Sequence, residues 1–324
     1  GSFRGSYSQL VAGILLGTTV LSFLIPATMG RIAITVPVVI ALAADAGYER
    51  GTPAYVGLVV AAVIGNFTIA LGVLPGNLLN MMVLGTGETL YGTTISYMKY
   101  LLLCGPVLGL VKGIICGRTI ISVSPAPPPC FAGRPTEADT LGPDAVRVAI
   151  VLAATIALWS TDVLHGLRPG TVAAIAGLAC MTPGIGVLGI GEALDPRRLF
   201  MLVWVATVFS LGAVLNESGA SQLVSDALSD VAQIGGKSPT YAYFALALLA
   251  AAMAAVTTIG GAIPIVTTAV GGFSSATGLP IDAGVLSVLA GMSAIFLPFA
   301  AAPIMVGIAM GRVDQLAAAR VPVV

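Results

Sequence analysis

One arginine, Arg31, stands in the middle of a long apolar run, where a charged side chain is costly. It follows a proline and a glycine in the stretch FLIPATMGRIAITVP, which covers residues 23–37. An arginine at the centre of a bilayer costs at least about 2.5–3.5 kcal/mol on insertion scales, so it needs a partner or a wet cavity. At the start of a half-helix, its guanidinium would add bidentate hydrogen bonds to a terminus that already attracts anions. The pattern therefore predicts that Arg31 and the nearby Thr28 bind an anionic substrate.

Other roles for Arg31 stay open at the level of sequence. The guanidinium could stand in for a coupling cation, which would make sodium dispensable. It could pair permanently with an intramembrane acid or with backbone carbonyls. The break could also lie near the membrane interface, where a long basic side chain reaches the water.

Polar residues interrupt two further apolar runs at three places and extend the predicted substrate site. The list is Asn66 and Thr68 in GNFT, Asn77 in LPGN, and Thr257 and Thr258 in TTIGG. Amide and hydroxyl groups at such breaks could hydrogen-bond an anion. A membrane threonine, however, often bonds only to its own helix backbone.

A second group of residues could bind a coupling cation, because hard cations take carbonyl and hydroxyl oxygens. Asn216, Ser218 and Gly219 lie in LNESG, and Gly260 follows the break in TTIGG. These four residues are the predicted sodium ligands. No other cofactor is expected. The adjacent Glu217 could bind a cation or carry a coupling proton, or it could simply belong to a helix cap.

The composition identifies the class of protein that must hold these residues. The 324-residue chain is 57% hydrophobic and only 9% charged, against about 25% charged residues in ordinary soluble domains. Continuous apolar blocks favour membrane-spanning helices over a barrel. The net charge is zero, which gives no reason to expect a nucleic-acid partner. The chain has no HExxH, P-loop or suitably placed GxSxG motif, so an enzyme is not expected.

The apolar blocks suggest two related halves. The blocks at 10–44, 55–84, 241–270 and 284–310 are long, and each is broken by Pro, Gly or polar residues. The blocks at 97–121, 146–160 and 171–190 are plain spans. Residues 199–234 are expected to form a re-entrant hairpin that breaks at 216–219. Paired broken helices of inverted topology are typical of secondary transporters.

Several stretches resemble the divalent-anion:sodium symporter family, which belongs to the ion-transporter superfamily. They are GNFTIALGVLPGNLLNMMVLG, YMKYLLLCGPVLGL, IALWSTDVLHGLRPGTVAAIAGLACMTPG and GVLSVLAGMSAIFLPFAAAPIMVGIAMGRV. The family carries Ser-Asn-Thr in its first broken helices. This chain instead has Pro26-Ala27-Thr28 in one half and Thr257-Thr258 in the other. Ile304 stands where the family has asparagine, whereas Asn77 keeps it. The family also begins with several scaffold spans that this sequence lacks.

The resemblance implies an elevator-type homodimer that carries a dicarboxylate, tricarboxylate or sulfate-like anion. Residues 1–96 would supply the first-repeat broken helices. Residues 97–198 would be the scaffold, with a polar loop at 122–145. Residues 199–324 would supply the second-repeat hairpin and broken helices. A multi-pass protein of the bacterial inner membrane is expected. The alternatives are a proton-coupled or antiporting relative, or a truncated, non-transporting subunit.

Overall fold

The computed structural model is built from helices. It describes residues 6–131, 142–189, 191, 195–257, 259–294, 301–314 and 318, and no strand occurs among them. Seven helical segments in this described part are long and apolar enough to cross a membrane. They are Tyr7–Leu24, Thr28–Asp45, Pro53–Gly72, Tyr97–Val123, Pro143–Ser160, Pro239–Val256 and Ile259–Thr277. The prediction of an all-α integral membrane protein is confirmed at this level.

The first part of the chain breaks where the sequence predicted. Its helices are α1 (Tyr7–Leu24), α2 (Thr28–Asp45), α3 (Pro53–Phe67) and α4 (Leu78–Tyr91), with the short 3-10 turns η1 (Ile69–Gly72) and η2 (Leu74–Gly76) between α3 and α4. Ile25 is extended, with φ −124° and ψ 102°, because the residue before a proline disfavours the helical region. Pro26 therefore ends α1, and the chain re-enters a helix at Thr28.

The middle part contains one long rod and three further helices. The rod consists of α5 (Tyr97–Cys104), the π-helical segment η3 (Gly105–Val111) and α6 (Lys112–Val123). The helices α7 (Pro143–Ser160), α8 (Asp162–His165) and α9 (Pro169–Met181) follow it, and α7 packs on α9. The predicted span at 171–190 is wrong in its length, because α9 ends at Met181. Thr182 is extended ahead of Pro183, and Gly184 follows with φ +87°.

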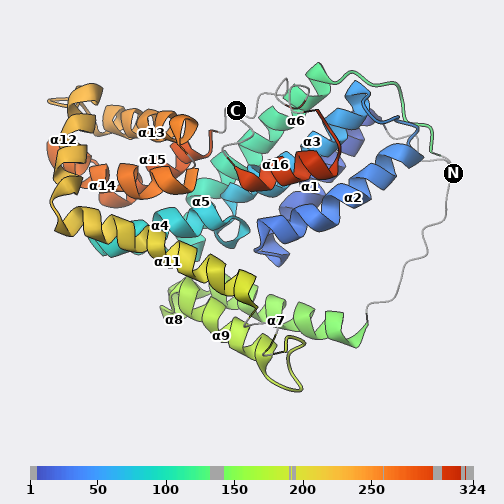
Figure 1. Cartoon of the computed structure of the whole chain (residues 1–324), viewed down its shortest axis with the longest axis horizontal. Coiled ribbons are helices and arrows are strands. Elements are labelled where there is room, and N and C mark those ends of the chain that lie inside the picture. Colours follow the sequence, from blue (N-terminus) through green and yellow to red (C-terminus); the bar gives the residue numbers. More distant parts are fainter. Residues whose placement is uncertain are drawn as a thin grey trace.

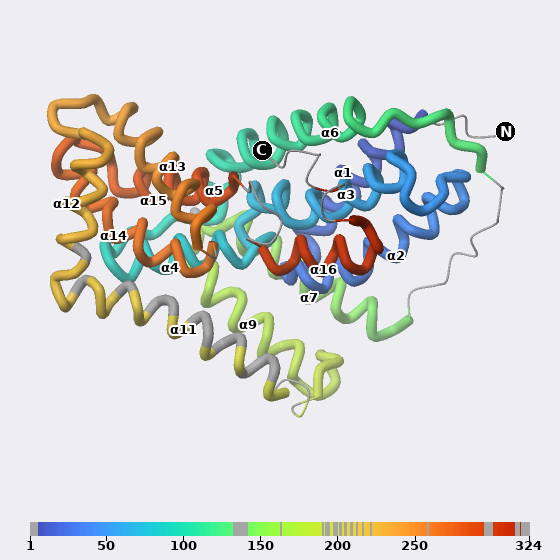
Figure 2. Tube along the Cα trace, turned by 45° about the horizontal axis from the view of Figure 1, so that its top comes forward, coloured from blue at the N-terminus to red at the C-terminus, as the bar shows by residue number. Residues whose placement is uncertain are grey.

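The last part again contains broken helices. They are α11 (Pro196–Glu217), α12 (Ala220–Ala232), α13 (Pro239–Val256), α14 (Ile259–Thr277), α15 (Ile281–Met292) and α16 (Ala302–Met310). The break between α13 and α14 falls at extended Thr257, as predicted. Gly219 joins α11 to α12 with φ +75°. In Figures 1 and 2, α12 turns sharply away from α11, and both helices pack against α14.

The packing of the two halves is reciprocal. In the first half, α1 and α2 both pack on α3, and in the second half α13 and α14 both pack on α15. The last helix of each half crosses to the other half: α4 packs on α14 and α15, while α16 packs on α2 and α3. Figure 1 shows this exchange, with the red α16 among the blue helices and the cyan α4 beside the orange ones. Helices α7–α9 lie along one side of this body.

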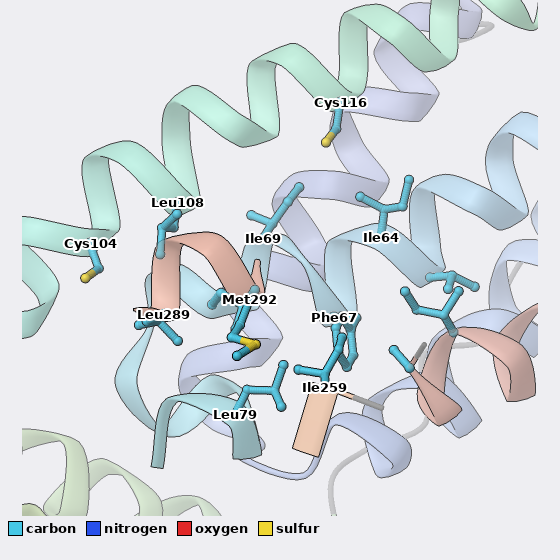
Figure 3. Packing of buried hydrophobic residues seen from close by; sticks show 14 of the residues in the cluster. Ile64, Phe67, Ile69, Leu79, Cys104, Leu108, Cys116, Ile259, Leu289 and Met292 are labelled. Atoms are coloured by element: carbon cyan, nitrogen blue, oxygen red, sulfur yellow. The ribbon is translucent and has the colours of Figure 1, made fainter. Parts of the chain in front are cut away.

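The breaks of both halves meet in the centre of the core. Phe67 ends α3, Leu79 lies in the first turn of α4 and Ile259 begins α14, and all three are buried. Figure 3 shows Phe67, Leu79, Ile259 and Met292 converging below the α5–α6 rod. Unwound backbone at membrane depth is tolerated only where protein or a cavity surrounds it. The polar residues at these breaks are therefore held where α3 and α15 end and where α4 and α14 begin.

Candidate functional site

Arg31 lies at the centre of the first-half breaks and is 0% exposed. Its Nη2 group donates to the carbonyl oxygens of Asn66 at 2.6 Å and Gly76 at 2.5 Å, and Nη1 donates to the carbonyl of Ile25. These carbonyls belong to the ends of α3, η2 and α1. One guanidinium thus satisfies backbone groups that three interrupted segments leave without helical partners. In this conformation Arg31 takes the role of binding backbone carbonyls, which was one of the alternatives that the sequence left open.

A side-chain network holds the guanidinium in place. Arg31 Nε donates to Asn66 Oδ1 at 3.3 Å, and Asn66 Nδ2 donates to Thr35 Oγ1 at 2.6 Å and to the carbonyl of Ala62. Thr35 Oγ1 in turn donates to the carbonyl of Arg31 at 2.8 Å. Thr28 Oγ1 lies 3.4 Å from Arg31 Nη2 and donates to the Gly76 carbonyl at 3.3 Å. The predicted residues Thr28, Arg31 and Asn66 are therefore brought together.

Two asparagines fix the unwound stretch between α3 and α4. Asn77 Oδ1 caps α4 by accepting from the Leu79 amide at 3.1 Å, and its Nδ2 donates to the Phe67 carbonyl at 2.9 Å. Asn80 Nδ2 donates to the carbonyl of Val73 at 2.8 Å and also reaches those of Leu71 and Leu74. Asn77 follows Gly76, whose carbonyl binds Arg31, so it lies near the other predicted site residues. Its side chain, however, already binds backbone groups of Phe67 and Leu79.

Two buried oxygens in the same stretch have no partner among the described residues. They are the Thr68 hydroxyl and Asn80 Oδ1, and both residues are 0% exposed. A buried polar atom without a hydrogen bond is costly and uncommon in native structures. These two atoms are therefore the best-supported contact points for a bound polar ligand. Thr68 was predicted from the sequence, whereas Asn80 was not.

The second half contributes less to this cluster. Thr257 Oγ1 donates to the Met253 carbonyl at 2.9 Å, one turn back along its own helix. Thr258 lies outside the described residues. Thr267 is buried on α14, and its hydroxyl has no partner within the described part of the chain. The polar groups of the second half therefore differ from those of the first half, although the two halves meet in the core.

The structure does not bring the four predicted sodium ligands together. Ser218 and Gly219 are exposed at the α11–α12 turn, and the Ser218 hydroxyl donates to the Leu215 carbonyl at 3.2 Å. Only the backbone of Asn216 is described. Gly260 lies in the first turn of α14. The α12 helix, which follows Gly219, meets α14 at a different place: its Ser225 contacts Gly272, twelve residues after Gly260. A separation of twelve residues along a helix is about 18 Å.

Comparison with known proteins supports only a broad class. No family model matches the chain. A protein named "Membrane protein" from Cupriavidus necator is 22% identical over 225 residues, which cover 67% of this chain and 44% of that protein. This chain is an integral membrane protein. It spans less than half of the length of that relative.

Three buried polar residues were given no role from the sequence. Asn80 lies three residues after Asn77, so the spacing in PGNLLN was an available signal. Thr35 lies one helical turn after Arg31, which was a second signal. Lys112 is a lysine in an apolar span, and it donates to the backbone and hydroxyl of Ser293 at the end of α15. Intramembrane charge is a functional signal by default, but its partner could not be named before the fold was known.

Proposed function

We propose that this chain is a secondary transporter of a small anion such as a dicarboxylate, tricarboxylate or sulfate. The observation that carries the proposal is the buried Arg31 guanidinium at the meeting point of broken helices. It binds the carbonyl of Asn66, two residues before Thr68, whose buried hydroxyl has no partner among the described residues. Ligand sites of secondary transporters lie at such breaks. The reciprocal packing of α1–α4 and α13–α16 agrees with two repeats around one central site.

Arg31 contributes its charge to the site, while other groups contact the anion. Its N–H groups already bind three carbonyls, so direct binding of the anion would need these contacts to open. The start of α2 has no side-chain cap, and its free N–H groups attract an anion. The Thr68 hydroxyl can donate to the same ligand. A positive charge in a water-poor core favours an anion beside it, because the effective dielectric constant is low there.

The resident positive charge also bears on coupling. Arg31 occupies carbonyl ends of broken helices, and such ends hold the coupling cation in other transporters. We propose that sodium is not needed at this position and that a proton or a counter-transported anion drives the cycle. Sodium-coupled symport, with the anion and cation moving together by an elevator motion, is the alternative drawn from the family resemblance.

The test is uptake of labelled succinate, citrate and sulfate into proteoliposomes, with and without an inward sodium gradient. The wild-type chain is expected to take up at least one of these anions. Thr68→Val should reduce that uptake, because the variant removes a hydroxyl and keeps the side-chain shape. Thr89→Val is the matched control, since the Thr89 hydroxyl is exposed and, within the described part of the chain, donates just to the Gly85 carbonyl of its own helix.

The two variants distinguish the site from a general effect on folding. Equal uptake by Thr68→Val and Thr89→Val would remove Thr68 from the site. Absence of uptake of every anion by folded wild-type protein would reject transport of these anions and favour a non-transporting membrane subunit.

A further inference from the structure

Lys112 makes a contact that the anion site does not use. It begins α6, in the middle of the long rod, and only 9% of its surface is exposed. Its Nζ group donates to the Ser293 carbonyl at 2.6 Å and lies 3.1 Å from the Ser293 hydroxyl. Ser293 is the C-cap of α15. A lysine from one part of the chain therefore binds the end of a broken helix from another part.

The end of α15 is a suitable place for a positive charge. The last carbonyls of a helix lack helical partners and carry partial negative charge, which a cation stabilises. In transporters built from broken helices, such ends coordinate the coupling cation. The Lys112 ammonium supplies a cation that belongs to the protein. Its position resembles that of Arg31, which binds the carbonyl ends of the first-half breaks.

Carboxylates do not balance this charge within the described residues. The titratable or charged groups of α6 and the elements packed against it are Cys116 and Arg118 on α6, Tyr7 on α1, Tyr55 on α3, and Asp282 at the start of α15. Tyr7 and Tyr55 donate to the carbonyls of Ala54 and Gly311. Asp282 pairs with Lys99 at the opposite end of α15. The ammonium is held mainly by one residue and a helix end. The strength of this contact therefore depends on the positive charge, which is lost with the proton.

We propose that Lys112 is a proton-binding site and that its proton fastens α6 to the end of α15. The ammonium donates to both oxygens of Ser293 and is attracted to the helix terminus. The neutral amine keeps donors but loses the charge, so the contact weakens and the end of α15 is released. Because the two events are linked, closing the contact must in turn favour proton binding.

This inference deepens the proposed function and rests on it for its role in transport. The rod belongs to residues 97–198, the expected scaffold, while α15 belongs to the expected moving part. A proton on Lys112 would then couple the pH gradient to movement of α15. The local contact can be tested without any transport.

The first experiment is hydrogen–deuterium exchange of the segment 289–294 in lipid nanodiscs. The pH runs from about 5.5 to about 10, a range in which both buried and free lysines in proteins can lose their proton. Wild type, Lys112→Met and Lys112→Arg are compared at each pH, which cancels the intrinsic pH dependence of exchange. At low pH, Lys112→Met should exchange about tenfold faster than wild type, within the range for a cation at a helix C-terminus. The wild-type rate should approach the Lys112→Met rate as the pH rises.

Lys112→Arg keeps the charge throughout this range, so it should stay protected at high pH where wild type does not. This comparison remains decisive even if Lys112→Met does not fold. Lys99→Met is the matched control, because Lys99 lies on the same rod and its ion pair is at the other end of α15. It should leave exchange at 289–294 unchanged.

A wild-type rate that keeps a constant ratio to Lys112→Arg across the pH range would overturn the proposal. Uptake measurements then separate the two hypotheses. If the exchange result holds and no anion is transported, the proton site stands and the transport function fails. If both hold, uptake by Lys112→Arg should lose the pH dependence of the wild type.

Discussion

At the scale of single residues, the charge that looked most out of place organises the centre of the fold. Arg31 could be singled out from the sequence, because a charged residue between a glycine and an apolar run is rare. Its partners could not be predicted. Backbone carbonyls occur at every position and leave no sequence signal, so only the fold shows that the carbonyls of Ile25, Asn66 and Gly76 meet at one point.

Arg31→Met should lower the free energy of unfolding by about 3 kcal/mol or more. The carbonyls of Ile25 and Asn66 lose their donor, and the Gly76 carbonyl keeps only that of Thr28. Each unsatisfied buried group costs about 1–3 kcal/mol. Arg31→Lys should recover part of the loss, because an ammonium keeps the charge but lacks the planar fork of donors. Reversible unfolding in mixed detergent micelles measures the difference. Arg50→Met is the control, since Arg50 is exposed in the α2–α3 connection. Equal stability of the variants at positions 31 and 50 would contradict this role.

At the scale of elements, the helix breaks could be predicted and the helix contacts could not. Proline and glycine disturb the helical backbone locally, so the breaks at Pro26 and Thr257 were visible in the sequence. Which surfaces meet depends on residues far apart in the chain. One example is η1 against η3, where an added Cβ at Gly72 would lie 2.7 Å from the backbone N and Cα of Gly109.

Gly72→Ala should therefore destabilise the protein by about 1–3 kcal/mol, the usual cost of forcing extra volume into a packed core. The obstacle is backbone, which cannot rotate away. Gly109→Ala is a matched control on the opposite side of the contact, because its Cβ would lie 3.7 Å from Gly72 Cα, an ordinary van der Waals distance. The two variants should differ clearly in thermal midpoint. Similar midpoints would show that η1 and η3 are not packed this tightly.

At the scale of the whole molecule, three charged contacts seen among the described residues join residues 97–198 to the broken helices. Lys99 pairs with Asp282, Lys112 binds Ser293, and Arg168 Nη1 lies 2.5 Å from Glu88 Oε1. The all-α membrane class could be predicted from the composition together with the continuous apolar blocks. The division into a scaffold and a moving part stays a prediction, because a single conformation shows which contacts join the two parts and not whether they separate.

Locking one of these contacts tests the division. Glu88 and Arg168 are both exposed, and an exposed ion pair contributes at most about 1 kcal/mol, so replacing both by cysteine should preserve the fold. In a Cys130→Ser background, a short thiol cross-linker between positions 88 and 168 should stop anion uptake, because α4 could no longer move relative to the α8–α9 connection. Anion binding should persist, and cleavage of the linker should restore uptake.

The control is Gln222→Cys with Asp226→Cys, a hydrogen-bonded pair one turn apart on α12, where the same linker joins parts of a single helix. If the 88–168 cross-link leaves uptake unchanged, then α4 and residues 97–198 move together, and the moving part must be sought elsewhere in the chain.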